Sequence, residues 1–334
     1  MRLDRAPLAT TPSPRRTRRR LRVWTVWKAK SGRTFHGDCM LPLLTAIVLH
    51  LIIAAQSTSS AVSMTSRAAI AQLRSTSSKK ANLLFVAQCT GWAKREGASM
   101  LFLPECLGFM GDSARHTLAN TDPPIDELLR RDAPTEADSE LRKMMAAALD
   151  GGGCDGPAGG ADGSRQQADE PPVESIIREL QFMASTAKLW ISGGGVHTRA
   201  PESEKIHNTH VIIDSDGRIR AHYHKMHLFD VSIPGKVALR ESNTTDPGDE
   251  LVVVDSPLGK LGLGICYDMR FPEMYVELVR RGAEVLLAPS AFTVPTGRAH
   301  WHALLRGESL VHSITQTWIQ PGNPQPEQSR DSAT

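Results

Sequence analysis

The sequence has few cysteines, and their number is odd. Five cysteines occur in 334 residues, at positions 39, 89, 106, 154 and 266. An odd number without paired spacing argues against a disulfide framework of the kind that supports small secreted domains. An apolar content of 40% is ample for a globular core without such bridges, in one large domain or two. We therefore expect free thiols in a reducing compartment.

The sequence also lacks an apolar run that is long enough to cross a bilayer without interruption. The stretch Met40-Leu-Pro-Leu-Leu-Thr-Ala-Ile-Val-Leu-His-Leu-Ile-Ile-Ala-Ala55 has sixteen residues and is interrupted by Pro42 and His50. As a helix it would reach ~24 Å, against ~30 Å for the hydrocarbon core. This length is typical of the apolar region of a signal peptide. Apart from such a leader, we do not expect the membrane to be a partner.

Acidic residues are scarce in the first 80 residues. This part contains 15 lysines and arginines but only Asp4 and Asp38 as acids, whereas the remainder contains 24 basic and 34 acidic residues. The overall charge of +3 therefore combines a basic leader with an acidic body. An acidic body argues against nucleic acid as a partner, because phosphate binding needs a clustered basic face.

Residues 1–68 are interpreted as this leader, disordered or used for targeting. It contains the basic stretch Pro14-Arg-Arg-Thr-Arg-Arg-Arg-Leu-Arg22 before the apolar segment. An arginine-rich, serine-rich and acid-poor leader fits a mitochondrial transit peptide, while the apolar segment fits a secretory signal. A third interpretation is upstream sequence that the mature protein never uses. The odd and unpaired set of cysteines favours a mitochondrial or cytoplasmic location.

One cysteine stands where an apolar strand is expected to end. The segment is Leu261-Gly-Leu-Gly-Ile-Cys-Tyr-Asp-Met-Arg-Phe-Pro-Glu273, and the preceding apolar run 250–255 predicts a second strand joined to it by a turn at 256–259. A helix is expected over 268–281, and its first N–H groups would lower the thiol pKa. Cys266 is therefore a candidate nucleophile. The alternative is a small buried apolar side chain, as most free cysteines are.

Two glutamates and one lysine also stand near predicted strands or turns. Glu105 ends the apolar strand Met100-Leu-Phe-Leu-Pro-Glu105, and Glu241 precedes the Pro-Gly turn at 247 and 248. Lys225 stands within Arg220-Ala-His-Tyr-His-Lys-Met-His-Leu-Phe-Asp230. Taken singly, each glutamate is most simply a solvated surface charge. Cys106, next to Glu105, is interpreted as a packing residue.

The histidines around Lys225 leave a metal site as an alternative. They are His222, His224 and His227. No cysteine or carboxylate completes a usual zinc spacing, and residues two apart on a strand, such as His222 and His224, simply share one face.

Together, Glu105, Lys225, Glu241 and Cys266 resemble the carbon–nitrogen hydrolase family, also called the nitrilase superfamily. That family uses Glu, Lys and Cys in this order along the chain, each at a strand end, with a second Glu between Lys and Cys. Further segments resemble its deaminated glutathione amidase branch, which includes the amidase half of a fusion with a fragile histidine triad domain. These segments are 194–197, 227–230, 233–235 and 289–293.

The resemblance implies an α/β fold, a four-layer αββα sandwich, and a role for each residue. Cys266 would be the nucleophile, Glu105 the general base, Lys225 the oxyanion-binding cation and Glu241 the residue that positions it. Tyr267 would add a backbone N–H, and Ser290 and Phe292 would line the substrate pocket. The implied substrate is a small amide, and neither a metal nor another cofactor is required.

Several other elements follow from periodicity and turn signals. Helices are expected over 81–96 and 176–188, strands over 69–72, 100–104, 189–192 and 283–288, and a hairpin with strands 210–214 and 218–224 around the turn at 215–217. A glycine-rich insert at 150–172 is predicted to be a disordered part of the surface.

The family resemblance ends near Arg306, so residues 69–306 are interpreted as the hydrolase domain and 307–334 as a disordered tail. The family's last helix and strands are then expected to be missing, which leaves the sandwich incomplete at its C-terminus and exposes strand edges. The family's homo-oligomer is not expected to form in its usual way. Three functions stay open: an amidase acting on deaminated glutathione, an omega-amidase releasing ammonia, and an inactive truncated member acting only as an interaction partner.

Overall fold

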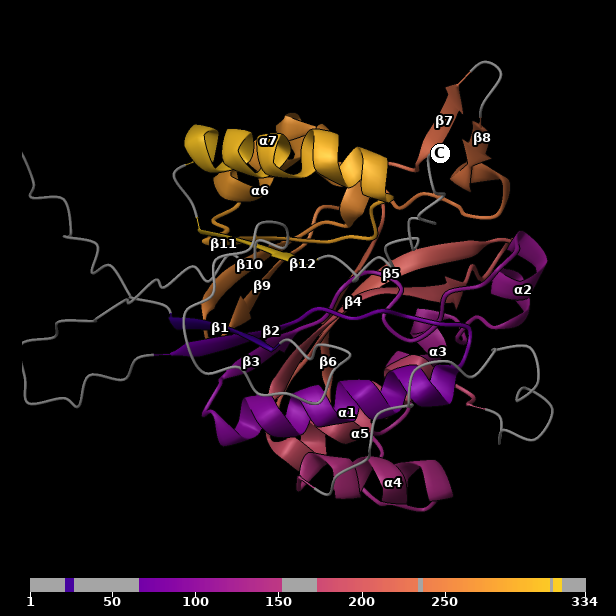
Figure 1. Ribbon diagram of the computed structural model, residues 1–334, viewed down its shortest axis with the longest axis vertical. Coiled ribbons are helices and arrows are strands. Elements are labelled where there is room, and N and C mark those ends of the chain that lie inside the picture. Colours follow the sequence, from indigo (N-terminus) through magenta and orange to yellow (C-terminus); the bar gives the residue numbers. More distant parts are fainter. Residues whose placement is uncertain (1–21, 27–65, 152–172, 234–236, 313–314, 320–334) are drawn as a thin grey trace, which may run out of the picture.

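A computed structural model describes residues 22–26, 66–151, 173–233, 237–312 and 315–319. Within these residues two β-sheets lie face to face, and helices cover both outer faces (Figure 1). The order of layers is helix, sheet, sheet, helix, as expected for an αββα sandwich. No helix in the described ranges is long and apolar enough to cross a membrane. The apolar segment 40–55 and residues 152–172 of the predicted insert lie outside these ranges.

The larger sheet has six strands in the order β1-β2-β3-β4-β5-β6. They are β1 (Arg22–Val26), β2 (Arg67–Ala71), β3 (Met100–Phe102), β4 (Trp190–Arg199), β5 (Ile206–Ile213) and β6 (Ile219–His224). The first four run parallel, because helical crossovers connect β2 to β3 and β3 to β4, whereas β4, β5 and β6 alternate in direction. The tight turn around Gly217 joins β5 to β6, as predicted.

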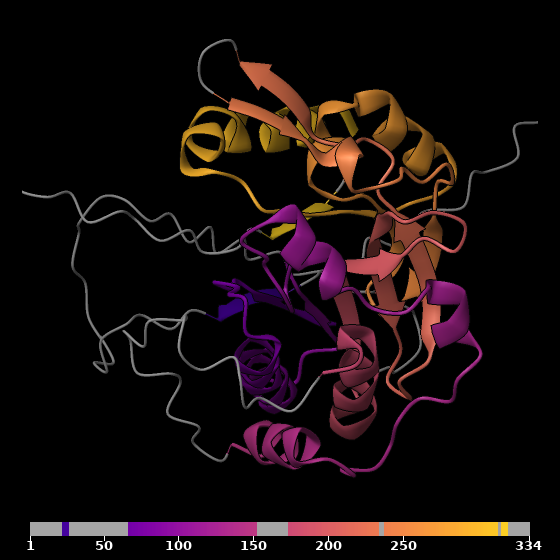
Figure 2. The same cartoon turned by 90° about the vertical axis from the view of Figure 1, so that its right-hand side faces the viewer.

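Helices fill the crossovers of the larger sheet, and the three longest of them cover its outer face. The helices of the crossovers are α1 (Lys79–Arg95), α2 (Ala114–Ala119), α3 (Ile125–Leu129), α4 (Glu140–Leu149) and α5 (Ile176–Ala187). Ser78, Ser139 and Ser175 cap α1, α4 and α5 by accepting a backbone N–H of the first turn. Figure 2 shows α1 and α5 side by side beneath the sheet, with α4 as the outermost helix.

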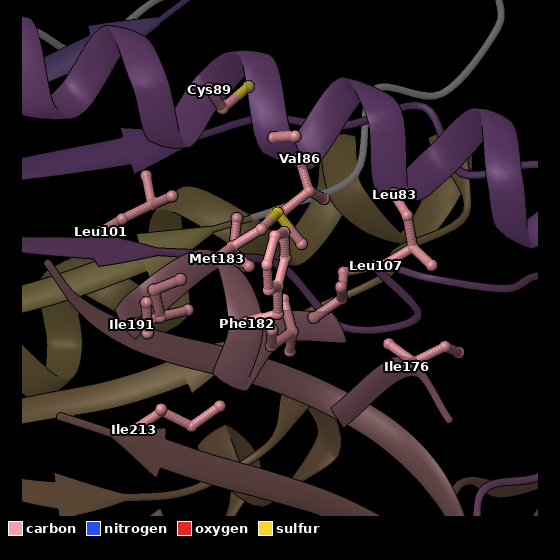
Figure 3. Close-up of a cluster of buried hydrophobic side chains, with 14 of the residues drawn as sticks. Leu83, Val86, Cys89, Leu101, Leu107, Ile176, Phe182, Met183, Ile191 and Ile213 are labelled. Carbon is pink, nitrogen blue, oxygen red and sulfur yellow. The ribbon is translucent and has the colours of Figure 1, made fainter. Parts of the chain in front are cut away.

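The main core lies between these helices and the larger sheet. Figure 3 shows Leu83 and Val86 of α1 facing Phe182 and Met183 of α5. Each of these four side chains is at most 1% exposed, and a fully buried side chain of this size contributes roughly 1.5–3 kcal/mol. This core holds β3 and β4 rigidly, which matters because residues just after β3 carry candidate chemistry.

The smaller sheet has four strands in the order β12-β11-β10-β9. They are β9 (Val253–Ser256), β10 (Gly259–Leu263), β11 (Val285–Pro289) and β12 (Thr315–Ile319), with α6 (Pro272–Arg280) and α7 (Val294–His312) on the outer face. In β10 and just after it, Leu261, Leu263 and Ile265 are fully buried. The alternate glycines face α6, because a Cβ at Gly264 would lie 2.6 Å from the hydroxyl of Tyr275.

The prediction for both ends of the chain needs correction. Residues 22–26 and 67–68, assigned to the leader, belong to β1 and β2. Residues 307–312 continue α7, and residues 315–319 form β12, which pairs in parallel with β11. The predicted disordered tail is therefore wrong for these residues. Apolar spacing in the segment 308–319 is weak, so periodicity did not reveal either element.

A small separate hairpin stands off from both sheets in both views (Figures 1 and 2). It consists of β7 (Asp230–Ile233) and β8 (Val237–Arg240), which pair with each other only among the described strands. The 3-10 turn η1 (Glu241–Asn243) follows at its base. The hairpin thereby connects the segment after β6 to Glu241.

Candidate active site

The four predicted residues come together from four strand ends. Glu105 lies three residues beyond β3, Lys225 follows β6 directly, Glu241 begins η1 after β8, and Cys266 begins the 3-10 turn η2 (Cys266–Arg270) shortly after β10. The larger sheet therefore supplies Glu105 and Lys225, and the smaller sheet supplies Cys266. A side chain at a strand end is held by the sheet while remaining accessible at its edge.

Lys225 lies between the two carboxylates. Its Nζ is 3.3 Å from Oε1 of Glu105 and 3.1 and 3.0 Å from the two oxygens of Glu241. Lys225 is 3% exposed and Glu105 is 5% exposed. The backbone N–H of Phe229 also donates to Glu241, over 2.6 Å. Glu241 thus fixes the ammonium from one side while Glu105 holds it from the other.

The charges of this trio keep the lysine protonated. Burial alone lowers the pKa of the Lys225 ammonium, but the charges of Glu105 and Glu241 oppose that effect, and the pKa is raised above its ordinary value. Two carboxylates and one ammonium give the trio a net charge of −1 when all three are ionised. An additional anion next to them is stabilised only if it contacts the ammonium or if a proton moves onto a carboxylate.

Cys266 has the left-handed backbone conformation, with φ of 46°. Such a conformation costs a non-glycine residue about 1–3 kcal/mol and is often found at functional sites. The Sγ atom lies 3.9 Å from the carbonyl oxygen of Ala291, whose own N–H donates to Oε2 of Glu105 over 2.8 Å. The loop after β11 therefore connects the thiol to the carboxylate.

The thiol is protonated at rest. Burial, and then the charge of Glu105, raise the pKa of Cys266 well above its ordinary value, although Lys225 acts in the opposite direction. The predicted lowering of this pKa by a following helix is wrong. A 3-10 turn follows the cysteine, and α6 begins only at Pro272, so the cysteine does not stand at the start of an α-helix. Formation of the thiolate therefore requires a base, and Glu105, whose charge acts on the sulfur, is the candidate.

Glycines bring β4 close to the glutamate. Gly194 has φ of +50°, and a Cβ there would lie 2.0 Å from the carbonyl oxygen of Pro104. A Cβ at Gly195 would lie 3.0 Å from Cγ of Glu105. The pairing of β4 with β5 shifts between Ser192 and Gly195, and the shift accommodates these two close approaches. A larger residue at either position would collide with these atoms, so the close approach of the backbone depends on both glycines.

The predicted pocket residues have different environments. Ser290 is fully buried and donates to the carbonyl oxygen of Ala288 over 2.8 Å. Phe292 packs edge-on against Trp301, with ring centroids 5.3 Å apart. Tyr267 contacts Phe229 and Phe271 edge-on, at 5.2 and 5.7 Å. Their contacts with a substrate stay a prediction.

The histidines near Lys225 do not converge. His222 and His224 share one strand face, as expected, with ring centroids 5.3 Å apart, and His224 stacks on His207 at 4.2 Å. His227 points elsewhere and bonds Asp268 over 2.8 Å. Across the described ranges, no group of three or more His, Cys, Asp or Glu side chains is placed to hold a metal ion.

Two site residues escaped the sequence analysis. The side chain of Asn208 on β5 donates from Nδ2 to Oε1 of Glu105 over 2.8 Å. The backbone carbonyl oxygen of Asn208 accepts the backbone N–H of Lys225 over 2.9 Å. Asp268, inside the cysteine motif, is fully buried and bonds the segment that carries Lys225. The available signal for Asn208 was the run of four polar residues 207–210 that leads into the predicted strand 210–214, because buried polar side chains need partners.

Residues 67–311 match the sequence model of the carbon-nitrogen hydrolase family. The chain belongs to this family. The match extends five residues beyond the predicted limit at Arg306 and includes Glu105, Lys225, Glu241 and Cys266. The family assignment made from these four residues and their order is thereby confirmed.

Two curated relatives and one solved structure illustrate the likeness. Deaminated glutathione amidase of Dictyostelium discoideum is 50% identical over 147 residues, which cover 43% of this chain and 50% of the relative. Deaminated glutathione amidase of Bos taurus is 36% identical over 246 residues, covering 72% of this chain and 60% of the relative. The chain therefore spans half to three fifths of the length of these relatives.

The crystal structure of the Caenorhabditis elegans NitFhit protein has a similar fold. It superposes with a TM-score of 0.55 at 33% sequence identity, over 77% of this chain and 52% of that protein. The α/β sandwich predicted from the sequence is confirmed by this likeness and by the layers described above.

Proposed function

We propose that this chain hydrolyses the carbon–nitrogen bond of a small amide through a thioester on Cys266. The observation that carries the proposal is the position of the Lys225 ammonium, bonded to both Glu105 and Glu241, together with Ala291, which contacts the Cys266 sulfur and donates to Glu105. Family membership supports the same reaction class. An amide is a poor electrophile, so its hydrolysis requires a nucleophile, a base and a cation for the developing oxyanion.

In the first half-reaction, Glu105 takes the proton of the Cys266 thiol as sulfur attacks the carbonyl carbon. The S–C bond forms, and the electron pair of the C=O bond moves to oxygen. Lys225 and the backbone N–H of Tyr267 bind this oxyanion. Because the proton moves onto Glu105 as the oxyanion appears, the net charge of the site does not change. The C–N bond then breaks, and Glu105 returns the proton to the leaving nitrogen.

In the second half-reaction, Glu105 takes a proton from water while the hydroxide oxygen attacks the thioester carbon. The S–C bond breaks, a carboxylic acid leaves, and the sulfur regains the proton from Glu105. Glu241 keeps Lys225 aimed at the carbonyl oxygen throughout, through its two contacts of 3.0 and 3.1 Å. The reaction uses only residues that the chain provides.

Deaminated glutathione is the substrate that we favour, since several relatives are named deaminated glutathione amidase, including the bovine and Dictyostelium proteins. An omega-amidase function is the second candidate, because omega-amidase NIT3 of Saccharomyces cerevisiae is 39% identical over 138 residues. The two differ in the leaving group, which is a substituted amine in the first case and ammonia in the second.

The test uses the purified full chain with deaminated glutathione and, separately, with the omega-amide of a small dicarboxylic acid. Mass spectrometry follows the new carboxylic acid and amine, a coupled assay follows ammonia, and added hydroxylamine traps an acyl-enzyme as a hydroxamate. Activity should vanish in Cys266→Ala and persist in Cys89→Ala, which removes a buried thiol of α1 far from the site. Equal activity in Cys266→Ala would overturn the mechanism. A folded chain without activity on either amide would favour the interaction-partner alternative.

A further inference from the structure

Asp268 is a fully buried carboxylate that accepts four hydrogen bonds. Its Oδ1 accepts the backbone N–H of His227 over 3.0 Å and pairs with Nδ1 of the same residue over 2.8 Å. Its Oδ2 accepts the hydroxyl of Tyr223 and the backbone N–H of Ile265, each over 2.8 Å. A carboxylate has about four acceptor positions, so Asp268 is saturated.

Two of these partners enclose the lysine. Tyr223 precedes Lys225 by two residues, and His227 follows it by two. The Tyr223 hydroxyl also accepts the N–H of Met226 over 3.1 Å, so the segment from 223 to 227 is bonded on both sides of Lys225. The His227 ring stacks on Phe271 with centroids 3.6 Å apart, which fixes the ring toward Asp268.

The remaining partner precedes the nucleophile. Asp268 accepts the N–H of Ile265 with its side chain and donates its own N–H to the carbonyl oxygen of Ile265 over 3.0 Å. These reciprocal bonds close the turn in which Cys266 has its left-handed conformation. The same carboxylate therefore touches the lysine segment of the larger sheet and the cysteine turn of the smaller one.

We propose that Asp268 is a positioning residue, which fixes the distance and direction from the Lys225 ammonium to a carbonyl carbon bonded to Cys266. This inference rests on the proposed function. Asp268 lies outside the trio of Glu105, Lys225 and Glu241, and all four donors that it contacts belong to the supporting segments. Its effect is geometric: the oxyanion forms at a point defined by the sulfur, and the cation must already lie there.

The test compares Asp268→Asn with the full wild-type chain. An asparagine has one acceptor oxygen, so its amide group would face two donors that it cannot satisfy. We expect kcat for amide hydrolysis to fall by on the order of 10- to 100-fold, with KM within about 3-fold, because misplacing a group by about 1 Å costs that much. The rate at which iodoacetamide alkylates Cys266 is followed by mass spectrometry of the peptide that contains it. This rate should differ from the wild-type rate by less than about 3-fold, because displacement of iodide creates no oxyanion for Lys225 to bind.

Asp122→Asn is the matched control. Asp122 is also fully buried, and it accepts Ser175 Oγ and the N–H groups of Ile176 and Ile177 over 2.7, 2.9 and 2.8 Å at the start of α5. Its replacement should lower the melting temperature but leave kcat of the folded protein unchanged. Parallel losses of hydrolysis and alkylation in Asp268→Asn would indicate a merely structural role and overturn the proposal.

Tyr223→Phe is the second variant for this test, and it replaces Asp268→Asn if that variant does not fold. It removes one hydroxyl, leaves the carboxylate in place and releases one side of the lysine segment. We again expect a fall in kcat with KM and alkylation retained, and an unchanged kcat would overturn the proposal. A folded wild-type chain that hydrolyses no amide would instead overturn the proposed function, and the positioning role with it.

Discussion

Nδ2 of Asn208 lies 2.8 Å from Oε1 of Glu105, the oxygen that also faces Lys225. A carboxylate only accepts hydrogen bonds, so the nitrogen of the Asn208 amide must face it. The other oxygen of Glu105 accepts the N–H of Ala291. Glu105 is therefore held at both oxygens by groups that do not react. This arrangement fixes the direction in which the base can take a proton from Cys266.

Replacement of Asn208 by alanine should therefore reduce catalysis more than stability. We expect kcat to fall by about 10- to 100-fold, since a base that can rotate is misaligned for much of the time. Steady-state kinetics with the favoured amide provide the measurement. Asn82→Ala is the control, because Asn82 is also a buried asparagine but bonds backbone around Thr76 and Gly108. Similar kcat values for the two variants would contradict the orienting role.

Glu241→Gln should reveal an alkaline limit to activity. In the wild-type chain the pKa of Lys225 is raised, so the ammonium persists throughout the neutral and moderately alkaline range. Loss of the Glu241 charge removes one of the groups that raise this pKa, while burial continues to lower it. A profile of kcat from pH 7 to 10 should be flat for the wild type and should decline toward high pH in the variant.

Asp230→Asn is the matched control for Glu241→Gln. Asp230 is an exposed carboxylate on the same hairpin and bonds Ser242 rather than the lysine. Its replacement should leave the pH profile unchanged. A flat profile in Glu241→Gln would mean that Glu105 alone keeps Lys225 protonated.

Glu105 and Cys266 could be predicted from the sequence because each follows a short apolar run, and the family resemblance added Lys225 and Glu241. Glu105 and Cys266 come shortly after β3 and β10, and Lys225 comes directly after β6. Residues at strand ends are identifiable from local pattern, and their order along the chain identified the family. The layered fold followed from the same resemblance.

The supporting residues could not be predicted in this way because their partners are distant in sequence. Asn208 meets a glutamate 103 positions earlier, and Asp268 meets a tyrosine 45 positions earlier. Neither separation leaves a local pattern. The pKa of Cys266 was mispredicted for a related reason. Only the structure shows that the thiol is buried, that the charge of Glu105 acts on it, and that a 3-10 turn rather than an α-helix follows the cysteine.

His210 should make the fold sensitive to acid. It is fully buried between the two sheets, where Nδ1 faces the carbonyl oxygen of Gly264 at 3.2 Å and Nε2 faces Oγ of Ser192 at 2.8 Å. A carbonyl only accepts, so Nδ1 carries the proton and Nε2 accepts from Ser192. Burial lowers the pKa of His210 to about 4.

The sign of the pH effect follows from this lowered pKa. Below about pH 6.5 the unfolded chain takes up a proton at His210 that the folded chain refuses until about pH 4, so the free energy of unfolding falls as the pH falls through this window. Between pH 7 and pH 5 the contribution is about 2 kcal/mol. Urea unfolding at pH 7 and pH 5 gives the difference in the free energy of unfolding between the two pH values. This difference should be smaller in His210→Gln than in the wild type. The exposed His300→Gln should leave it unchanged, and equal differences in both variants would exclude His210 as the cause.

Gly194→Ala should damage both the fold and the site, because two separate penalties meet at this glycine. The positive φ costs an alanine about 1–2 kcal/mol, and the added Cβ would overlap the carbonyl oxygen of Pro104, which is backbone and cannot rotate away. Gly97→Ala isolates the first penalty, since φ there is +67° and the nearest atom to its Cβ, on Arg67, is 3.7 Å away. Urea unfolding should give the larger loss for Gly194→Ala. Relief of the overlap moves Pro104 and the attached Glu105. We therefore expect kcat of the folded protein to fall in Gly194→Ala and to stay unchanged in Gly97→Ala. Equal kcat values in the two variants would show that the strand end accommodates the methyl group without moving the base.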